Sequence, residues 1–257
     1  MGDKPIALVT GAGWWPDYDP GIGLALAREM GERGHRVLVT DRELAPAQRS
    51  VEQLKSEGLD ARAAVLDVTD KAQCKAVLDK LIAAEGRLDT LVNAAALTLA
   101  RWGLKQFHDI LPEQCDQEIE VTLKGALNVT RAALPAMYQR GAGSIIFISS
   151  VMGYEPSPQM SIYGLSKAAL INFTMSLAAE AGPRGIRVNA ICPGVIKTRV
   201  TNRMPPAHTE KFLRNSALHR VGEPAEIAKV AGFLVSEAAS FVTGQAIRVD
   251  GGSMGIV

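Results

Sequence analysis

The 257-residue sequence lacks the features that mark membrane, nucleic-acid-binding or metal proteins. Its net charge of +1 gives no strong field toward nucleic acid or a membrane surface. No apolar run reaches the roughly 18 residues that a membrane-spanning helix needs. The three cysteines, Cys74, Cys115 and Cys192, are widely spaced and form no C-x-x-C pair, so we expect reduced thiols and no metal site. We therefore expect a cytoplasmic chain, without a secretory signal because the first predicted strand starts near Pro5.

Short β-rich runs alternate with longer helical patterns along the whole chain. Most of these runs are almost continuously apolar, as is typical of strands that are covered on both faces. This alternation predicts an α/β fold with a single domain over residues 1–257, built on a doubly wound, seven-stranded parallel sheet with helices on both faces. The irregular stretch 197–218 is a candidate substrate lid. The predicted strands are 5–10, 35–40, 61–66, 88–93, 143–149, 186–191 and 246–250.

The segment VTGAGWWPDYDPGIGLALA, residues 9–27, has the form of a strand, a glycine turn and a helix. Gly11 and Gly13 follow the strand, and Gly21 and Gly23 open the helix. Glycines let a backbone approach a pyrophosphate, and a helix N-terminus offers free N–H groups to it. The common G-x-G-x-x-G fingerprint fails, because Pro16 stands in the place of the third glycine. A merely flexible turn is the alternative interpretation.

Two acids lie where predicted strands end. Asp41 ends the second strand, where a carboxylate can accept both ribose hydroxyls of an adenosine and repel a 2′-phosphate, which favours NAD over NADP. A helix-capping role is the alternative for Asp41, and its neighbour Arg42 can still reach a phosphate. Asp67 ends the third strand and can accept from the adenine amino group or cap the next helix.

Tyr163 and Lys167 are the strongest chemical signal in the sequence. They lie four residues apart at the start of a helical pattern, YGLSKAAL, and so share one face. A nearby ammonium lowers the pKa of a phenol, which predicts a general acid/base that works near neutral pH. Ser150 follows the apolar strand SIIFIS and can donate to a substrate oxygen. Ser149 is the alternative to Ser150, because one of two neighbouring side chains must face away.

At these residues the chain resembles the short-chain dehydrogenase/reductase family over nearly its whole length. The family's T-G-x-x-x-G-x-G, N-N-A-G, Ser, Y-x-x-x-K and P-G-x-x-x-T motifs occur in order, as does a family-like last strand, GQAIRVDGG. The resemblance implies a Rossmann fold and Ser150, Tyr163 and Lys167 as catalytic residues. It also implies a set of cofactor-binding residues: Gly11, Gly21, Ile22, Gly23, Asp41, Asp67, Val68, Asn93, Tyr163, Lys167, Pro193, Gly194, Ile196 and Thr198.

One departure from the family falls in the segment VTLKG, where Thr122 replaces a catalytic asparagine. That asparagine is thought to hold a water that links the lysine to a proton relay. The Thr122 hydroxyl either holds this water or bonds back along its own helix. Thr122 is therefore carried over as a fourth candidate catalytic residue with its role open.

The other departure lies in the glycine turn. Nine residues separate Gly11 from Gly21 where the family pattern has three, so six residues, 14–19, are inserted. Enoyl-acyl-carrier reductases of a divergent branch also have an expanded glycine loop, but their lysine follows the tyrosine by seven positions, and that position here is Leu170.

The insertion holds three of the thirteen aromatic residues (6 Phe, 3 Trp, 4 Tyr). Each tryptophan ring left in water would forfeit roughly 150–250 Å² of burial. We therefore expect Trp14 or Trp15 to pack on the protein beside the adenosine half of the cofactor. Asp17 and Asp19 should point away from the pyrophosphate, which they would repel.

The resemblance implies an NAD(H)-dependent oxidoreductase that interconverts a secondary alcohol and its ketone. Tyr163 exchanges the proton, Ser150 stabilises the substrate oxygen, and Lys167 tunes Tyr163 and binds the nicotinamide ribose. Family members are often homotetramers with the Tyr163 helix at an interface. A non-catalytic NAD(P)-binding sensor, supported by Thr122 alone, and an NADP-dependent ketoreductase, supported by Arg42, are the alternatives.

The substrate is a small molecule whose identity the sequence leaves open. The candidate lid carries five cations, which would attract a carboxylate or a coenzyme A ester, although a solvated loop explains them equally well. Residues 94–102 and 151–160 should wall the pocket together with the lid. Apolar candidates for this wall are Trp102, Met152, Tyr154 and Met160, and the lid cations are Lys197, Arg199, Arg203, Lys211 and Arg214, against Glu210.

Deletion of Trp14–Asp19 tests the assignment of the insertion to the cofactor side. We expect a higher Kd for NAD, because a wall of the adenosine site is lost, with little change in substrate preference. The Kd is measured by titration calorimetry and the preference by a panel of alcohols. Unchanged NAD affinity, or a switch in preferred alcohol, would contradict the assignment.

Overall fold

A parallel sheet of seven strands forms the centre of the molecule. A computed structural model describes residues 4–15, 20–97, 103–156, 158–198, 201, 210 and 213–253. The strand order is β3-β2-β1-β4-β5-β6-β7, and each neighbouring pair is parallel, which confirms the predicted sheet. The strands are β1 (Ile6–Thr10), β2 (Arg36–Asp41), β3 (Ala61–Val65), β4 (Thr90–Asn93), β5 (Gly143–Ile148), β6 (Ile186–Pro193) and β7 (Ala246–Val249).

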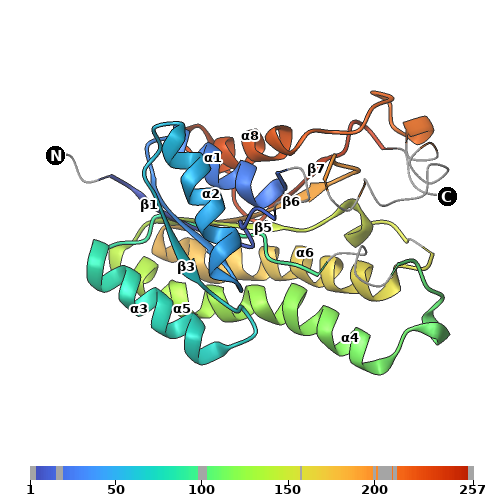
Figure 1. Ribbon diagram of the computed structural model, residues 1–257, viewed down its shortest axis with the longest axis horizontal. Helices are drawn as coiled ribbons and strands as arrows, with labels where there is room; N and C mark the ends of the chain where they lie inside the picture. The colour runs from blue at the N-terminus through green and yellow to red at the C-terminus, as the bar shows by residue number, and fades with distance from the viewer. Residues whose placement is uncertain are drawn as a thin grey trace.

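Helices cover both faces of the sheet (Figure 1). One face carries α1 (Ile22–Glu32), α2 (Leu44–Ser56) and α8 (Pro224–Val235). The other carries α3 (Lys71–Glu85), α5 (Gly125–Arg140) and α6 (Ser161–Ala181). The helix α4 (Pro112–Glu118) runs into α5 through a π-helical turn, η3 (Ile119–Lys124). Short 3₁₀ turns are η2 (Phe107–Asp109), η4 (Val151–Gly153), η5 (Gly182–Arg184) and η7 (Glu237–Ala239).

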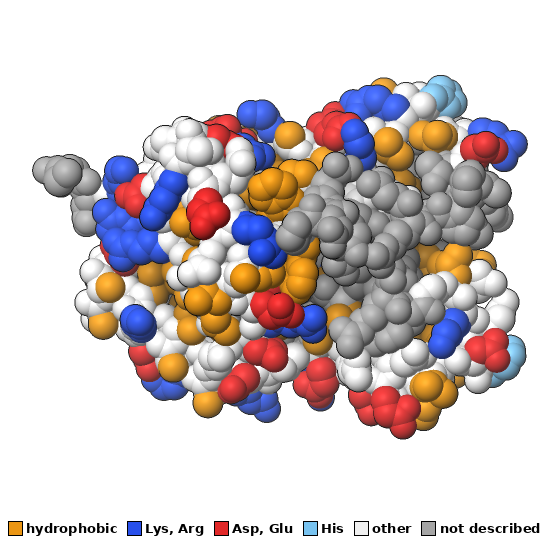
Figure 2. All heavy atoms as spheres, in the orientation of Figure 1, with side chains coloured by type: hydrophobic (Ala, Val, Ile, Leu, Met, Phe, Trp, Pro, Cys, Tyr) orange, Lys and Arg blue, Asp and Glu red, His pale blue; other side chains and the backbone are white. Residues whose placement is uncertain are grey.

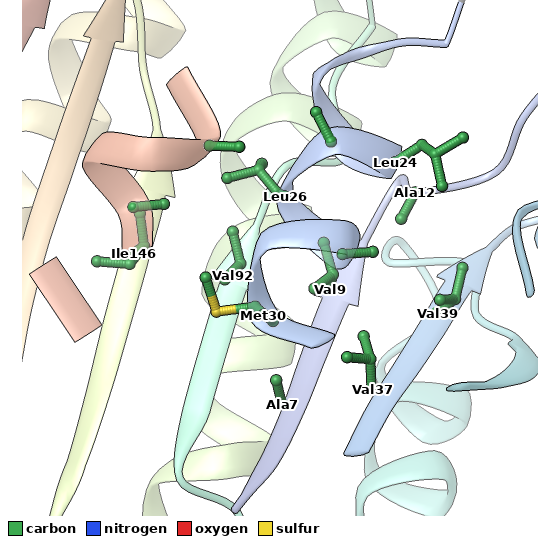
Figure 3. Close-up of a cluster of buried hydrophobic side chains, with 14 of the residues drawn as sticks. Ala7, Val9, Ala12, Leu24, Leu26, Met30, Val37, Val39, Val92 and Ile146 are labelled. Atoms are coloured by element: carbon green, nitrogen blue, oxygen red, sulfur yellow. The ribbon is translucent and has the colours of Figure 1, made fainter. Parts of the chain in front are cut away.

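Alternation along the central strand divides the core into two layers. In β1, Ala7 and Val9 face α1, while Ile6 and Leu8 face the α3, α5 and α6 layer. Figure 3 shows side chains of α1, among them Met30, packed on β1, β2 and β4. Burial of one such side chain contributes roughly 1.5–3 kcal/mol. This packing fixes α1 behind the turn that joins it to β1.

The surface matches the balanced composition. Figure 2 shows acidic and basic side chains interspersed over the visible face, without a large field of one sign. Among the described residues, no helix combines the length and apolar character that a membrane crossing requires.

The β1–α1 turn depends on two glycines that meet. Gly11 has φ +63°, the left-handed region that glycine adopts without strain. Any Cβ on Gly23, in the first turn of α1, would lie 2.2 Å from the Gly11 carbonyl oxygen. Gly21 is different, because a Cβ there would meet no atom within 4 Å. Close contact of helix and strand therefore requires Gly23, whereas Gly21 leaves open space at the helix N-terminus.

Gly23→Ala and Gly21→Ala form a matched pair that tests this packing. Gly23→Ala should lower the Tm by about 4 °C or more, because overpacking against a backbone oxygen costs about 1–3 kcal/mol. Gly21→Ala should change the Tm by less than about 2 °C, since its methyl group meets open space. Calorimetry of both variants checks the prediction, and equal Tm losses would refute it.

Candidate active site

The residues predicted for the site gather at the carboxyl edge of the sheet. Asp41 ends β2, Asn93 ends β4, and Pro193 ends β6. Gly11 follows β1, and Ser150 follows β5 after one intervening residue. Because these strands are parallel neighbours, their ends line one edge, which is where doubly wound sheets bind ligands.

The glycine turn fits a nucleotide pyrophosphate. Gly21 is the N-cap residue of α1, no side chain caps the helix there, and its first turn has no acidic residue. Ile22, at the first helical position, packs against the core beneath the turn. The positive end of the helix dipole and its free N–H groups thus face the open space beside Gly21. A bound pyrophosphate would lie against this turn, with Gly11 and Gly23 allowing its close approach.

Backbone hydrogen bonds fasten the start of the insertion to β2 and α2. The Ala12 N–H donates to the Thr40 carbonyl and the Trp14 N–H to the Pro46 carbonyl, both at 3.0 Å. The Trp14 carbonyl accepts from Arg49 Nε at 2.9 Å. The Trp14 side chain packs against the core on the α2 side, as predicted. Pro16, Asp17, Tyr18 and Asp19 lie outside the described residues.

Asp41 stands beside this loop. Its Oδ2 accepts from the Gly13 N–H at 3.1 Å, and a Cβ on Gly13 would lie 2.6 Å from the same oxygen. Burial raises the pKa of Asp41, while bonds from the N–H groups of Gly13, Glu43 and Arg42 lower it. The capping interpretation is wrong, because α2 starts at Leu44 and its N-cap residue is Glu43. Arg42 is exposed, and its guanidinium lies 3.5 Å from Glu43.

Asp67 and Val68 line the next position along the edge. Asp67 Oδ1 accepts from the backbone N–H and the hydroxyl of Thr69, at 2.9 and 2.7 Å. Asp67 does not cap α3 as the alternative predicted, because Asp70 is the N-cap residue and accepts from the Gln73 N–H. Val68 is buried, so its backbone rather than its side chain is available to a ligand.

The remaining predicted cofactor residues extend from β4 to the start of the lid. Asn93 is buried, and its Nδ2 donates to Thr130 on α5 at 3.1 Å. Gly194 packs against Asp250, where a Cβ would lie 2.7 Å from the Asp250 Cβ. Ile196 is buried, and the Thr198 N–H donates to Thr201 Oγ1 at 2.8 Å. Asn93 thus acts within the described structure as a tie between β4 and α5.

Ser150, Tyr163 and Lys167 come together between β5 and α6. Ser150 is buried, its oxygen accepts from the Met152 N–H at 3.2 Å, and its hydroxyl donates to the Tyr163 oxygen. Lys167 Nζ donates to the Ile148 carbonyl at 2.8 Å and lies 5.5 Å from the centroid of the Tyr163 ring. Four-residue spacing on α6 therefore does put both side chains on one face, toward the end of β5.

Ser149 faces away from Tyr163, as expected for one of the two serines. Its hydroxyl donates to the Lys167 carbonyl at 2.8 Å. That bond ties β5 to the backbone of α6, so Ser149 has a structural role and Ser150 is the serine at the reacting position.

The charges of the site differ from the simple expectation. Burial raises the pKa of Tyr163 to about 12, the bond from Ser150 lowers it, and the Glu118 carboxylate adds to the rise. Burial also lowers the pKa of Lys167 to about 8, against the opposing effect of Glu118. The expected lowering of the Tyr163 pKa is therefore wrong for this structure, because loss of water around the phenol outweighs the attraction of Lys167.

Thr122 bonds back along its own helix, which was one of its two expected roles. Its hydroxyl donates to the Glu118 side chain four residues earlier, and its oxygen accepts from the Leu97 N–H at 3.1 Å. Glu118 is the residue that the motifs missed. It is buried at the end of α4, and its spacing from Thr122 is the only signal in the sequence that could have indicated it.

The expected pocket wall is described in part. Met160 is buried, and the Tyr154 hydroxyl donates to the Ala246 carbonyl on β7 at 2.9 Å. Within the described ranges no three His, Cys, Asp or Glu side chains lie close enough to ligate one metal ion. Outside these ranges lie Trp102 and the lid cations Arg199, Arg203 and Lys211.

Comparisons with known proteins agree with this geometry. A family model described as Enoyl-(Acyl carrier protein) reductase matches residues 18–254. The chain is 34% identical to Dehydrogenase/reductase SDR family member 4 of Bos taurus, over 98% of this chain and 88% of the relative. It is 37% identical to a 3-oxoacyl-[acyl-carrier-protein] reductase of Thermotoga maritima, over 96% of each chain.

A solved structure of 7α-hydroxysteroid dehydrogenase with NADH and 7-oxo glycochenodeoxycholic acid matches with a TM-score of 0.90. It is 31% identical, and the match covers 99% of this chain and 96% of that one. Such coverage at this identity extends over every strand and helix that builds the site. The chain therefore belongs to the short-chain dehydrogenase/reductase family of oxidoreductases, which bind a nicotinamide cofactor and act on small molecules.

Proposed function

We propose that the protein is an NAD(H)-dependent oxidoreductase that interconverts a secondary alcohol and its ketone. The observation that carries this proposal is the hydrogen bond from Ser150 to the Tyr163 oxygen, with Lys167 beneath the tyrosine ring. Two hydroxyl groups directed at one point suit an oxygen atom that gains and loses a proton. The nicotinamide ring, when bound, supplies the hydride donor or acceptor.

In the direction of reduction, Tyr163 donates its proton to the ketone oxygen as the carbinol forms. The Ser150 hydroxyl donates a hydrogen bond to the same oxygen and stabilises the negative charge that develops there. In oxidation the Tyr163 oxygen accepts the hydroxyl proton. Lys167 provides the positive charge that makes the phenolate accessible, and its Nζ keeps N–H donors beyond the one given to Ile148 for the nicotinamide ribose.

A phenol with a pKa of about 12 is protonated at neutral pH, so Tyr163 is poised as a proton donor. This supports ketone reduction as the favoured direction at neutral pH. Oxidation needs the phenolate, whose fraction rises with pH, so its rate should rise toward alkaline pH.

Three observations support NAD and a ketone. Asp41 presents a carboxylate at the end of β2, where it would accept ribose hydroxyls and repel a 2′-phosphate. The 7α-hydroxysteroid dehydrogenase structure contains NADH and a 7-oxo compound. The four-residue spacing of Tyr163 and Lys167 favours alcohol and ketone chemistry over the enoyl reduction named by the family model.

The proposed protein is cytoplasmic and a homotetramer. The exposed side chains of Leu165 (52%) and Met175 (48%) support a subunit interface on α6, the helix that carries Tyr163. Apolar side chains of this size gain free energy when a partner covers them.

Tyr163→Phe removes only the transferable proton. We expect turnover of ketone and alcohol to be almost abolished while the Kd for NAD stays within about twofold. Ser150→Ala, by loss of one donor to the substrate oxygen, should lower kcat by roughly a hundredfold. Steady-state assays of reduced cofactor at its absorbance band and calorimetric NAD titrations check both. Full activity of Tyr163→Phe would exclude the mechanism, and a wild type that turns over no alcohol or ketone would favour a cofactor sensor.

Asp41→Ala should narrow a preference of the wild type for NAD over NADP. Asp41→Asn is the matched variant, because it keeps the acceptor for the Gly13 N–H and removes only the charge. If repulsion of the 2′-phosphate sets the preference, both variants should gain affinity for NADP. A wild type that binds NADP more tightly would show that Arg42 outweighs Asp41, and would favour the NADP-dependent alternative.

A further inference from the structure

A buried carboxylate lies next to the catalytic lysine and has no part in the mechanism above. Glu118, the last residue of α4, is 5% exposed. Its Oε1 has no hydrogen-bond partner among the described residues. The Thr122 hydroxyl donates to the same carboxylate, and the Lys167 ammonium lowers its pKa while burial raises it. A carboxylate with an open oxygen in such a place is costly unless a positive charge faces it.

The groups that face Lys167 come from three elements. Tyr163 lies on its own helix, Glu118 approaches from α4, and Cys192 from β6. Burial raises the pKa of the Cys192 thiol to about 11, so the thiol is neutral near pH 7, as is the Tyr163 phenol. Within the described part of the chain, Glu118 is therefore the one group near Lys167 that carries a negative charge at neutral pH.

Thr122 is oriented so that it holds this carboxylate. A threonine hydroxyl has one hydrogen and can accept as well as donate. Its oxygen accepts the Leu97 N–H from the loop after β4, at 3.1 Å, which leaves the hydrogen for Glu118. The π-helical turn η3 packs against α6 and carries Thr122 at the level of Lys167. The contacts thus run from the β4 loop through Thr122 and Glu118 toward the ammonium.

We propose that Glu118, held by Thr122, is the counter-ion that keeps the buried Lys167 protonated. It is a positioning residue that acts through Lys167, at the place where the family has asparagine four residues later on the helix. This inference rests on the proposed function, because it assigns the Glu118–Thr122 pair to the same site. Each buried charge compensates the other, and removal of one leaves its partner uncompensated.

The opposing effects give the test a definite sign. The Glu118 carboxylate raises the pKa of Lys167, against burial, which lowers it to about 8. Glu118→Gln keeps the size of the side chain and an acceptor for Thr122 but removes the charge. It should lower the pKa of Lys167 by roughly 1 to 3 units, so that the lysine becomes largely neutral at neutral pH. A side chain that only fills space would leave this pKa unchanged.

The measurement is a pH titration of the Lys167 Nζ resonance in protein labelled with ¹⁵N at its lysine Nζ atoms, assigned by its loss in Lys167→Met. Glu120→Gln is the matched control, because Glu120 lies two residues further on, is half-exposed and pairs with Lys124. We expect the shift in Glu118→Gln and none in Glu120→Gln. The alkaline fall of ketone reduction should move to lower pH by the same amount. A Lys167 pKa that stays within about 0.3 units in Glu118→Gln would overturn the proposal.

A second measurement decides if Glu118→Gln does not fold. Coupling between two titrating groups is reciprocal, so loss of Lys167 must raise the pKa of Glu118 as much as Glu118 raises that of Lys167. The ¹³C carboxyl resonance of Glu118 in Lys167→Met should therefore titrate roughly 1 to 3 units higher than in the wild type. No such rise would refute the pairing. Neither titration needs turnover, so absence of dehydrogenase activity would refute the proposed function and leave this test intact.

Discussion

Two hydrogen bonds between the end of β5 and a single lysine hold the active site together. Lys167 Nζ donates to the Ile148 carbonyl, and the Lys167 carbonyl accepts from Ser149. The side chain and the backbone of one residue thus fix α6 to the strand end at two points. Because Ser150 follows directly on β5 and Tyr163 lies one turn before Lys167, this attachment sets the serine against the tyrosine. An ammonium placed here must lose its water, and the electrostatics of the site follow from that loss.

Loss of water acts on all three titratable groups in the same direction, toward their neutral forms. It raises the pKa of Tyr163 and Glu118 and lowers that of Lys167. The site is therefore not a free phenolate beside a free ammonium. Its chemistry depends on which charges support one another, and a carboxylate held by Thr122 alters that balance. The same reasoning applies at Asp41, where backbone N–H groups compensate a carboxylate that burial penalises.

Local patterns predicted the elements but not the contacts between them. Apolar runs identified all seven strands, and the left-handed Gly86 ends α3 as its position indicated. The Tyr163–Lys167 spacing predicted a shared helix face because helical geometry alone decides it. Capping roles for Asp41 and Asp67 were wrong alternatives, because a shift of two or three residues in a helix start moves the cap elsewhere. Glu118 escaped notice because its partner Lys167 is 49 positions away, and only the packing of α4 and η3 on α6 joins them.

The central claim is that hydride reaches a carbonyl carbon while Tyr163 protonates its oxygen. The most direct measurement is incubation with NADH deuterated at the transferable position of C4, a panel of ketones and enoyl thioesters, and mass spectrometry of the products. The account predicts an alcohol with one deuterium on the carbinol carbon. Deuterium on a former alkene carbon, or no labelled product from any ketone, would contradict it.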